Sequence, residues 1–124
     1  MKSKLRNINV NQIDFKYLIN EKYQKENEGY WLTTLRVFRE SFKNTPLEIK
    51  FKSIDGYAIG NILTSGIMIN EKEFNLHKPS IIRELIEEGI AQKWNWENSK
   101  FEISNGLKLL AEIGYDIESL KPTN

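Results

Sequence analysis

The sequence contains no cysteine, one histidine (His77) and three prolines in 124 residues. Without cysteine there is no disulfide framework, no zinc–thiolate site and no thiol nucleophile. A chain of this length is typical of one domain, and it can bury a real core without disulfides or metal. We therefore expect a single domain over residues 1–124, with residues 115–124 as a tail of uncertain order.

Long hydrophobic runs are also missing. Residues 1–10 are basic but contain no apolar stretch and no small-residue cleavage site, so they are not typical of a secretory signal. No apolar stretch approaches the length of about 20 residues that a membrane-spanning helix needs. These features predict a cytoplasmic protein without a membrane partner.

The net charge is only +1, but the two signs are unevenly distributed. Residues 1–52 contain 11 Lys or Arg and 6 Asp or Glu, a net of +5, whereas residues 53–124 contain 7 and 11, a net of −4. Such a division can steer a charged partner toward one end of the molecule. The alternative, that every charge is merely solvated, has equal weight because surface charge is weak functional evidence.

Two amphipathic helices are expected at the start of the chain. Asn9 or Asn11 can cap a helix over residues 11–26, and Gly29 ends it. A second helix is expected over residues 30–43. Its apolar residues recur at helical spacing and form one stripe, which consists of Trp31, Leu35, Phe38 and Phe42.

The hydrophobic period changes to two at Leu47. Apolar and polar residues alternate over residues 47–52, which predicts a half-buried strand. The pair Asp55-Gly56 favours a tight hairpin, so Ile54, Tyr57 and Ile59 would share the lysine-bearing face. Short strands over residues 66–69 and 73–76 would complete an antiparallel β-meander of three to four strands.

The last third of the chain predicts a helix, a β-hairpin and a second helix. Pro79 suits the first turn of a helix that ends at Gly89. Strands over residues 91–96 and 101–104 would form the hairpin. Ser104 or Asn105 would cap the last helix, which ends at Gly114. The predicted fold class is therefore α+β, with two N-terminal helices, the meander and this helix–β-hairpin–helix unit.

Candidate catalytic residues are few. His77 lies three residues from Ser80, but a hydroxyl at a helix start usually caps the helix, and no third group completes a triad. Two groups of carboxylates occur in polar surroundings that favour a solvated face. They are Glu71 with Glu73, and Glu84 with Glu87 and Glu88. We predict no enzyme, no cofactor and no metal site; a deep pocket with His77 and two carboxylates would indicate an enzyme instead.

Residues 80–117 resemble the second half of a winged-helix module. The resemblance rests on the segments IIRELIEEG, IAQKWNWENSKFEIS and NGLKLLAEIG. It implies a DNA-binding regulator in which the basic N-terminal half contacts phosphates and Lys93 and Lys100 lie on the wing. The helix that would enter the major groove has an acidic outer face, which opposes binding to DNA. DNA binding is therefore the alternative function, and nucleic acid is not the expected partner.

Two surfaces remain as candidates for partner binding. One is the apolar trio Ile54, Tyr57 and Ile59, unless the first two helices cover it. The other is the acidic helix face. An apolar anchor beside a charged field provides both affinity and a fast on-rate. The predicted partner-binding residues are Asp55, Tyr57, Ile59, Glu84, Glu87, Glu88 and Trp96. For Trp96, as for Trp94, a position in the core is the favoured alternative.

In general character the chain is similar to the small bacterial immunity proteins of contact-dependent growth inhibition and other polymorphic toxin systems. The similarity rests on its size, the cysteine-free α+β domain, the lack of a catalytic site and the acidic, adhesive surface. It implies a non-enzymatic protein that binds a cognate toxin domain, such as a nuclease, and blocks it by occlusion. The oligomeric state stays open.

Overall fold

The computed structural model describes residues 5–25, 29–54, 61–64, 66–69 and 72–120. Its largest element is a five-stranded sheet with the strand order β1-β2-β3-β4-β7. The first four strands form an antiparallel meander, and they are β1 (Arg6–Val10), β2 (Ile13–Gln24), β3 (Tyr30–Arg39) and β4 (Phe42–Ile54). The short strand β7 (Phe101–Ile103) pairs with β4 in the parallel direction.

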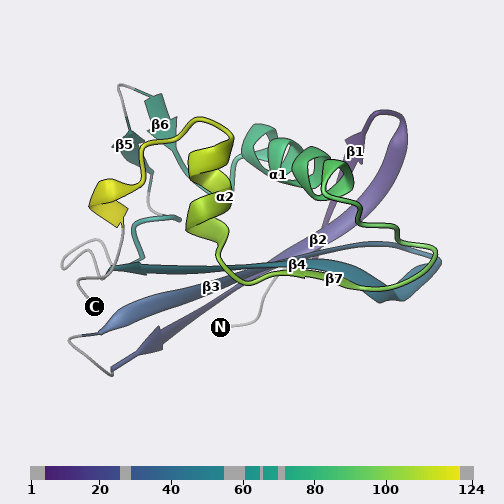
Figure 1. Cartoon of the computed structure of the whole chain (residues 1–124), viewed down its shortest axis with the longest axis horizontal. Helices are drawn as coiled ribbons and strands as arrows, with labels where there is room; N and C mark the ends of the chain where they lie inside the picture. Colours follow the sequence, from purple (N-terminus) through teal and green to yellow (C-terminus); the bar gives the residue numbers. More distant parts are fainter. Residues whose placement is uncertain (1–4, 26–28, 55–60, 65, 70–71, 121–124) are drawn as a thin grey trace.

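Both helices lie on the same side of this sheet (Figure 1). Helix α1 (Pro79–Ala91) packs over β1, and helix α2 (Gly106–Glu112) packs over β4. A separate two-stranded hairpin and a 3₁₀ turn lie beside α2 (Figure 1), and they are β5 (Ile67–Ile69), β6 (Lys72–Phe74) and η2 (Glu118–Leu120). Within the described residues no helix covers the opposite face of the sheet.

The prediction of two N-terminal helices is wrong, because residues 11–26 and 30–43 contribute mainly to β2 and β3, and residues 42–43 already begin β4. Asn11 and Gln12 both have positive φ, at 52° and 68°, and Val10 pairs with Ile13 across them. This geometry is a two-residue type I′ hairpin turn, in which asparagine is favoured because it tolerates positive φ. Asn11 therefore turns a hairpin and does not cap a helix.

The apolar stripe predicted over residues 30–43 is divided between two faces of β3. Leu35 and Val37 are fully buried and face the helices, in alternation with half-exposed residues at positions 34 and 36. Phe38 is 8% exposed but lies outside the main core cluster, because it points to the other face. The segment is rich in aromatic and β-branched residues, which favour a strand, and this preference prevails over the helical spacing.

The core lies between the helices and the covered face of the sheet. Side chains from β1 to β4 alternate into it, because successive residues of a strand point to opposite faces. The strands supply many of the fully buried side chains, and the helices and the connecting segments at Leu63 and Leu76 supply others. Residues with no more than 1% exposure include Val10, Phe15, Leu35, Val37, Leu47, Ile49, Phe51, Ile82, Leu85, Ile86 and Leu110.

The predicted strand over residues 47–52 and the two C-terminal helices are confirmed. Pro79 stands in the first turn of α1, and the Asn105 side chain caps α2 by accepting a 3.1 Å hydrogen bond from the Lys108 main-chain N–H. Gly114, with φ of 108°, follows α2 as expected. Gly89 does not end α1: it is buried inside the helix, and an added Cβ would lie 2.5 Å from Cδ2 of Leu47.

The predicted hairpin over residues 91–96 and 101–104 is wrong, because residues 92–100 contain no strand and β7 pairs with β4 instead. Two hydrogen bonds hold this loop on β4. The Trp94 indole N–H donates to the main-chain oxygen of Thr45, and the Thr45 hydroxyl donates to the main-chain oxygen of Trp96. The loop is therefore hydrogen-bonded to a strand that is distant in the sequence. The alternation of apolar and polar residues within the loop does not predict this pairing.

Three further predictions concern the short strands of residues 66–76, the hairpin at Asp55-Gly56 and the C-terminal tail. The short strands predicted around residues 70–72 are β5 and β6, but they form their own small sheet and do not extend the meander. The predicted hairpin at Asp55-Gly56 lies outside the described residues. In the C-terminal tail, Ile117 and Leu120 are buried against the core, so the chain is packed as far as residue 120.

Candidate protein-binding surface

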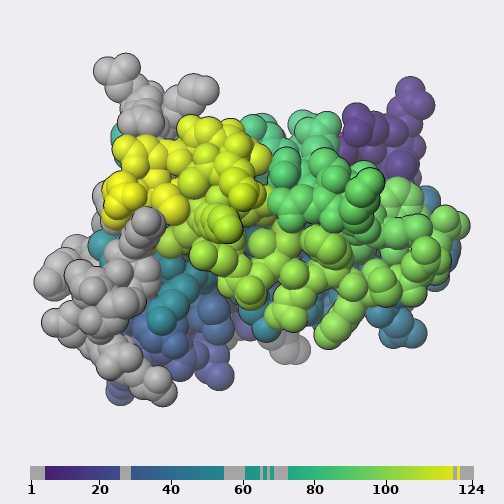
Figure 2. Space-filling view, viewed as in Figure 1, coloured from purple at the N-terminus to yellow at the C-terminus, as the bar shows by residue number. Residues whose placement is uncertain are grey.

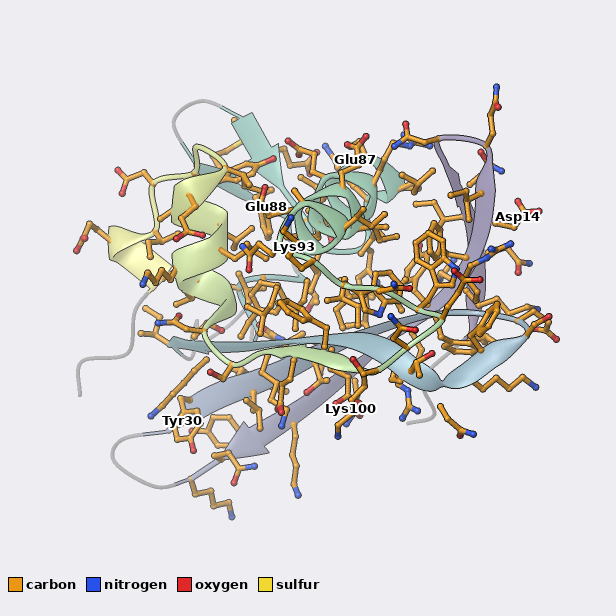
Figure 3. The ribbon with its side chains drawn as sticks, turned by 45° about the vertical axis from the view of Figure 1, so that its right-hand side comes forward. Asp14, Tyr30, Glu87, Glu88, Lys93 and Lys100 are labelled. Atoms are coloured by element: carbon orange, nitrogen blue, oxygen red, sulfur yellow. The ribbon has the colours of Figure 1, made fainter. Side chains whose placement is uncertain are left out.

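Helix α1 presents an acidic outer face. Glu84 and Glu87 are exposed and Glu88 is half-exposed, whereas Ile81, Ile82, Leu85 and Ile86 on the other side of the helix are buried. Figure 3 shows Glu87 and Glu88 on α1, on the opposite side of the sheet from Tyr30. The structure therefore places all three predicted carboxylates on one exposed helix face.

Two of these three carboxylates are held by neighbouring side chains. The Tyr115 hydroxyl donates a 3.1 Å hydrogen bond to Oε1 of Glu84, and the Gln92 amide donates a 3.2 Å bond to Oε2 of Glu88. Burial, followed by this bond to Glu84, raises the pKa of Tyr115 to about 12. Among the described residues Glu87 has no hydrogen bond or ion pair, so its carboxylate is the one most available to a partner.

The fold converts the uneven charge of the sequence into two layers. Residues 6–54, which include β1 to β4, contain nine Lys or Arg and six Asp or Glu, a net of +3. Residues 79–120, which include both helices and β7, contain four and eight, a net of −4, and one of these carboxylates, that of Glu102, lies on the uncovered face of the sheet beside Lys50. Figure 2 shows that the segments coloured green to yellow, which carry this negative charge, form much of the surface on the viewed side.

Trp96 belongs to an aromatic cluster and is not part of the acidic face. Its ring lies 5.6 Å from the rings of both Phe15 and Trp94, and the Arg39 guanidinium lies 5.5 Å from its centre. Trp96 is half-buried and Trp94 is 3% exposed. The contacts come from β2, β3 and the loop, so the position in the core that was favoured for both tryptophans is confirmed for Trp94 and partly confirmed for Trp96.

The second predicted surface cannot be assembled from the described residues. Asp55, Tyr57 and Ile59 lie outside them. Ile54 is partly buried at the end of β4 and packs against the core. The two N-terminal segments that, as helices, were the alternative cover for this trio are strands of the same sheet.

The uncovered face of the sheet carries charge pairs that the sequence analysis missed. Three ion pairs join neighbouring strands or turns at distances of 3.5, 3.7 and 2.7 Å, and they are Lys16–Glu40, Arg36–Glu48 and Lys50–Glu102. Lys52 lies 4.3 Å from the centre of the Tyr30 ring. The alternation of residues 13–24 and 30–39 is the signal that could have revealed this face, had the segments been recognised as strands.

A groove lies between β7 and α2, and the sequence analysis did not predict it. It is an open depression of about 360 Å³. It follows the chain from β7 to the start of α2 and is bounded by α2 and the end of α1. Its lining residues are Gln92, Phe101, Glu102, Ile103, Ser104, Asn105, Lys108, Leu109 and Glu112.

His77 is exposed in the turn before α1, where its main-chain N–H donates a 2.9 Å hydrogen bond to Oδ1 of Asn75. It does not line the groove. Among the described residues there is no group of three His, Cys, Asp or Glu that could hold a metal ion.

The winged-helix resemblance is not supported by the arrangement of the strands. A wing requires the β-hairpin between the helices, and residues 92–100 form a loop. Lys93, with φ of 88°, lies in this loop and not on a wing, and Lys100 directly precedes β7.

Comparison with known proteins identifies no relative: no protein family, curated protein or solved structure matches this chain. None of the described helices has the length and the hydrophobicity that crossing a membrane requires.

Proposed function

We propose that this protein is a non-enzymatic binding module that captures a basic protein domain on the acidic surface of its helices. The expected partner is the cognate toxin domain of a polymorphic toxin system, which the protein would neutralise by occlusion in the cytoplasm. The observation that supports this proposal is the separation of charge between the two layers, with a net of −4 over residues 79–120.

The acidic layer suits recognition of a basic partner for two physical reasons. First, Glu84, Glu87 and Glu88 lie on one face of α1, so their fields add and raise the rate at which a cationic domain arrives. Second, Glu84 and Glu88 are positioned by Tyr115 and Gln92, so little side-chain freedom is lost on binding. Glu87 lies between them with an unengaged carboxylate.

A basic partner is consistent with toxin chemistry. A domain that cleaves nucleic acid must carry a positive surface to bind phosphate, and an acidic inhibitor can cover that surface. The present layer includes six acidic residues on and beside the helices: Glu84, Glu87, Glu88, Glu112, Asp116 and Glu118. Within residues 79–120, the basic residues on and beside the helices are Arg83, Lys93 and Lys108.

The test is a binding measurement with the product of the adjacent upstream gene, the candidate toxin domain, at about 50 mM and about 150 mM salt. We expect a complex at or below micromolar concentration, with an association rate that falls as salt rises. Glu87→Lys should lower the association rate roughly threefold to tenfold. Glu40→Lys, an exposed change at the far turn between β3 and β4, should leave it within about twofold.

Two results would contradict the proposal. One is the absence of a complex at micromolar concentration. The other is an equal response to Glu87→Lys and Glu40→Lys, since an effect of total charge alone would not require the helix face. Duplex DNA added as a competitor distinguishes the alternative function, because a DNA-binding regulator would bind it directly with strong salt dependence.

A further inference from the structure

We propose that the outer edge of β7, with the groove beside it, binds an extended segment of the protein partner, which joins the sheet as an additional strand. This inference names the docking site of the binding function proposed above, and it rests on that function. Two independent features support it: the unpaired edge of β7 and the groove along that edge.

The first feature is the open edge. In the described part of the chain β7 is the last strand of the sheet and pairs only with β4, in the register Leu47 to Phe101 and Ile49 to Ile103. Alternate residues of a strand direct their N–H and C=O groups to opposite sides. At least one residue of β7 therefore presents both groups to the open side, where an added strand can satisfy them.

The second feature is the groove. Its lining includes five successive residues from Phe101 to Asn105, so it runs along the backbone of β7. Lys108, Leu109 and Glu112 of α2 form the facing wall. A segment added to the open edge of β7 would lie next to this groove, and the side chains that it directs to the helical side of the sheet could enter it.

The groove is lined by both apolar and polar residues. Phe101 and Ile103 are half-buried and Leu109 is 2% exposed, and these three residues are the apolar part of the lining. The other six lining residues are polar, and Lys108 and Glu112 are among them. The groove can therefore contact both apolar and polar side chains of a bound segment.

Edge strands are often protected by charged residues, proline or short length. β7 is short and has Glu102 at its centre, but this carboxylate is engaged. Lys50 of β4 lies 2.7 Å from it, and their hydrogen bond raises the pKa of Lys50 and lowers that of Glu102. The charge is therefore held toward the neighbouring strand, and it leaves the open edge of β7 accessible.

The occupant is an extended basic segment of a protein. A strand edge is satisfied by another peptide backbone, which a nucleic acid does not supply. Glu112 lines the groove with a carboxylate that no ion pair neutralises among the described residues, and residues 79–120 have a net charge of −4, which repels phosphate and attracts Lys or Arg. The segment should alternate apolar residues, which enter the groove, with basic ones.

A peptide experiment tests the site without the partner. The full-length ¹⁵N-labelled protein is titrated to millimolar concentration with Ac-Lys-Val-Lys-Val-Lys-Val-Lys-NH₂, and amide chemical shifts are followed. We expect saturable shifts over residues 101–105 and 108–112. The peptide Ac-Lys-Pro-Lys-Pro-Lys-Pro-Lys-NH₂ has the same charge but lacks every second N–H donor, and it should shift these amides at least tenfold less. Equal shifts by both peptides, or none in these residues, would overturn the proposal.

A second experiment uses the upstream toxin domain. Lys108→Trp fills the groove and should weaken the complex at least tenfold. Ala111→Trp adds the same ring at an exposed position of α2 outside the groove lining and should change affinity less than twofold. Circular dichroism confirms that both variants are folded.

The outcomes separate the two proposals. If the unmodified protein does not bind the toxin domain, the proposed function fails, and the peptide titration still decides whether β7 accepts a strand. If the toxin domain binds and Lys108→Trp has no effect, the acidic layer alone accounts for binding and the β7 site is overturned.

Discussion

The indole N–H of Trp94 donates a 3.0 Å hydrogen bond to the main-chain oxygen of Thr45, across 49 residues of sequence. Trp94 is 3% exposed, and the Thr45 hydroxyl returns a bond to the main-chain oxygen of Trp96. Together these bonds hold the loop after α1 on the first part of β4. They also set the position from which β7 enters the sheet.

Trp94→Phe should lower the free energy of unfolding by about 1–3 kcal/mol. It leaves the Thr45 carbonyl without its donor and removes part of a buried ring. Urea denaturation at neutral pH measures the change. Trp96→Phe is the matched control and should cost less, because Trp96 is only half-buried and its main-chain oxygen, not its ring nitrogen, holds the loop. A Trp94 variant as stable as the unmodified protein would contradict this role.

Gly106→Ala should destabilise the protein by about 1–3 kcal/mol, although alanine is the better helix former. An added Cβ would lie 2.4 Å from Cδ2 and 2.6 Å from Cε2 of Phe51, a ring that is fully buried. The clash forces α2 away from β4. Measured in a Phe51→Leu background, the same change should cost less, because the smaller side chain leaves room. Equal costs in both backgrounds would show that the contact with Phe51 is not the cause.

Gln12→Gly should stabilise the protein by about 0.5–1 kcal/mol. Gln12 has φ of 68°, and glycine adopts positive φ without the steric cost that other residues incur. The change also creates Asn-Gly, the pair most favoured in type I′ turns. The main-chain N–H of residue 12, which donates to Oδ1 of Asn9, is retained. Thermal denaturation tests the direction: a lower melting temperature would argue against the assigned turn.

Tyr115 should make stability fall at high pH. Burial, then its bond to Glu84, raises its pKa to about 12, against about 10 in the unfolded chain. Since the folded state holds the proton more tightly, this contribution is fully present below about pH 10 and is lost as pH rises toward about 12. Tyr115→Phe should therefore lose less stability over that interval than the unmodified protein. Parallel stability curves from pH 9 to 12 would contradict the assignment.

Several elements could be predicted from short-range signals. The alternation from Leu47 to Lys52 identified part of β4, and Pro79 and Asn105 marked the starts of α1 and α2. The acidic residues of α1 could also be assigned to one exposed face, because the buried residues of that helix recur at helical spacing. Each of these features depends on residues within a few positions of one another.

The segments that became β2 and β3 could not be recognised in this way. A strand is identified by polar and apolar alternation, and that signal weakens when both faces carry apolar side chains. Phe38 is buried on the face opposite Leu35 and Val37, so the local pattern imitates a helix. Asn11 is compatible with the observed type I′ turn. However, asparagine is also favoured as a helix N-cap, so this residue alone did not distinguish a hairpin from a helix.

By itself, the sequence determined the starts of α1 and α2, the Asn105 cap of α2, part of strand β4, the absence of thiol chemistry and the uneven distribution of charge. The tertiary structure alone decided that β7 pairs with β4, that Trp96 joins Phe15 and Arg39, and that the groove forms beside α2. The physical reason is range: caps and turns are satisfied by adjacent residues, whereas strand pairing and ring packing are settled by partners that folding brings together from distant parts of the chain.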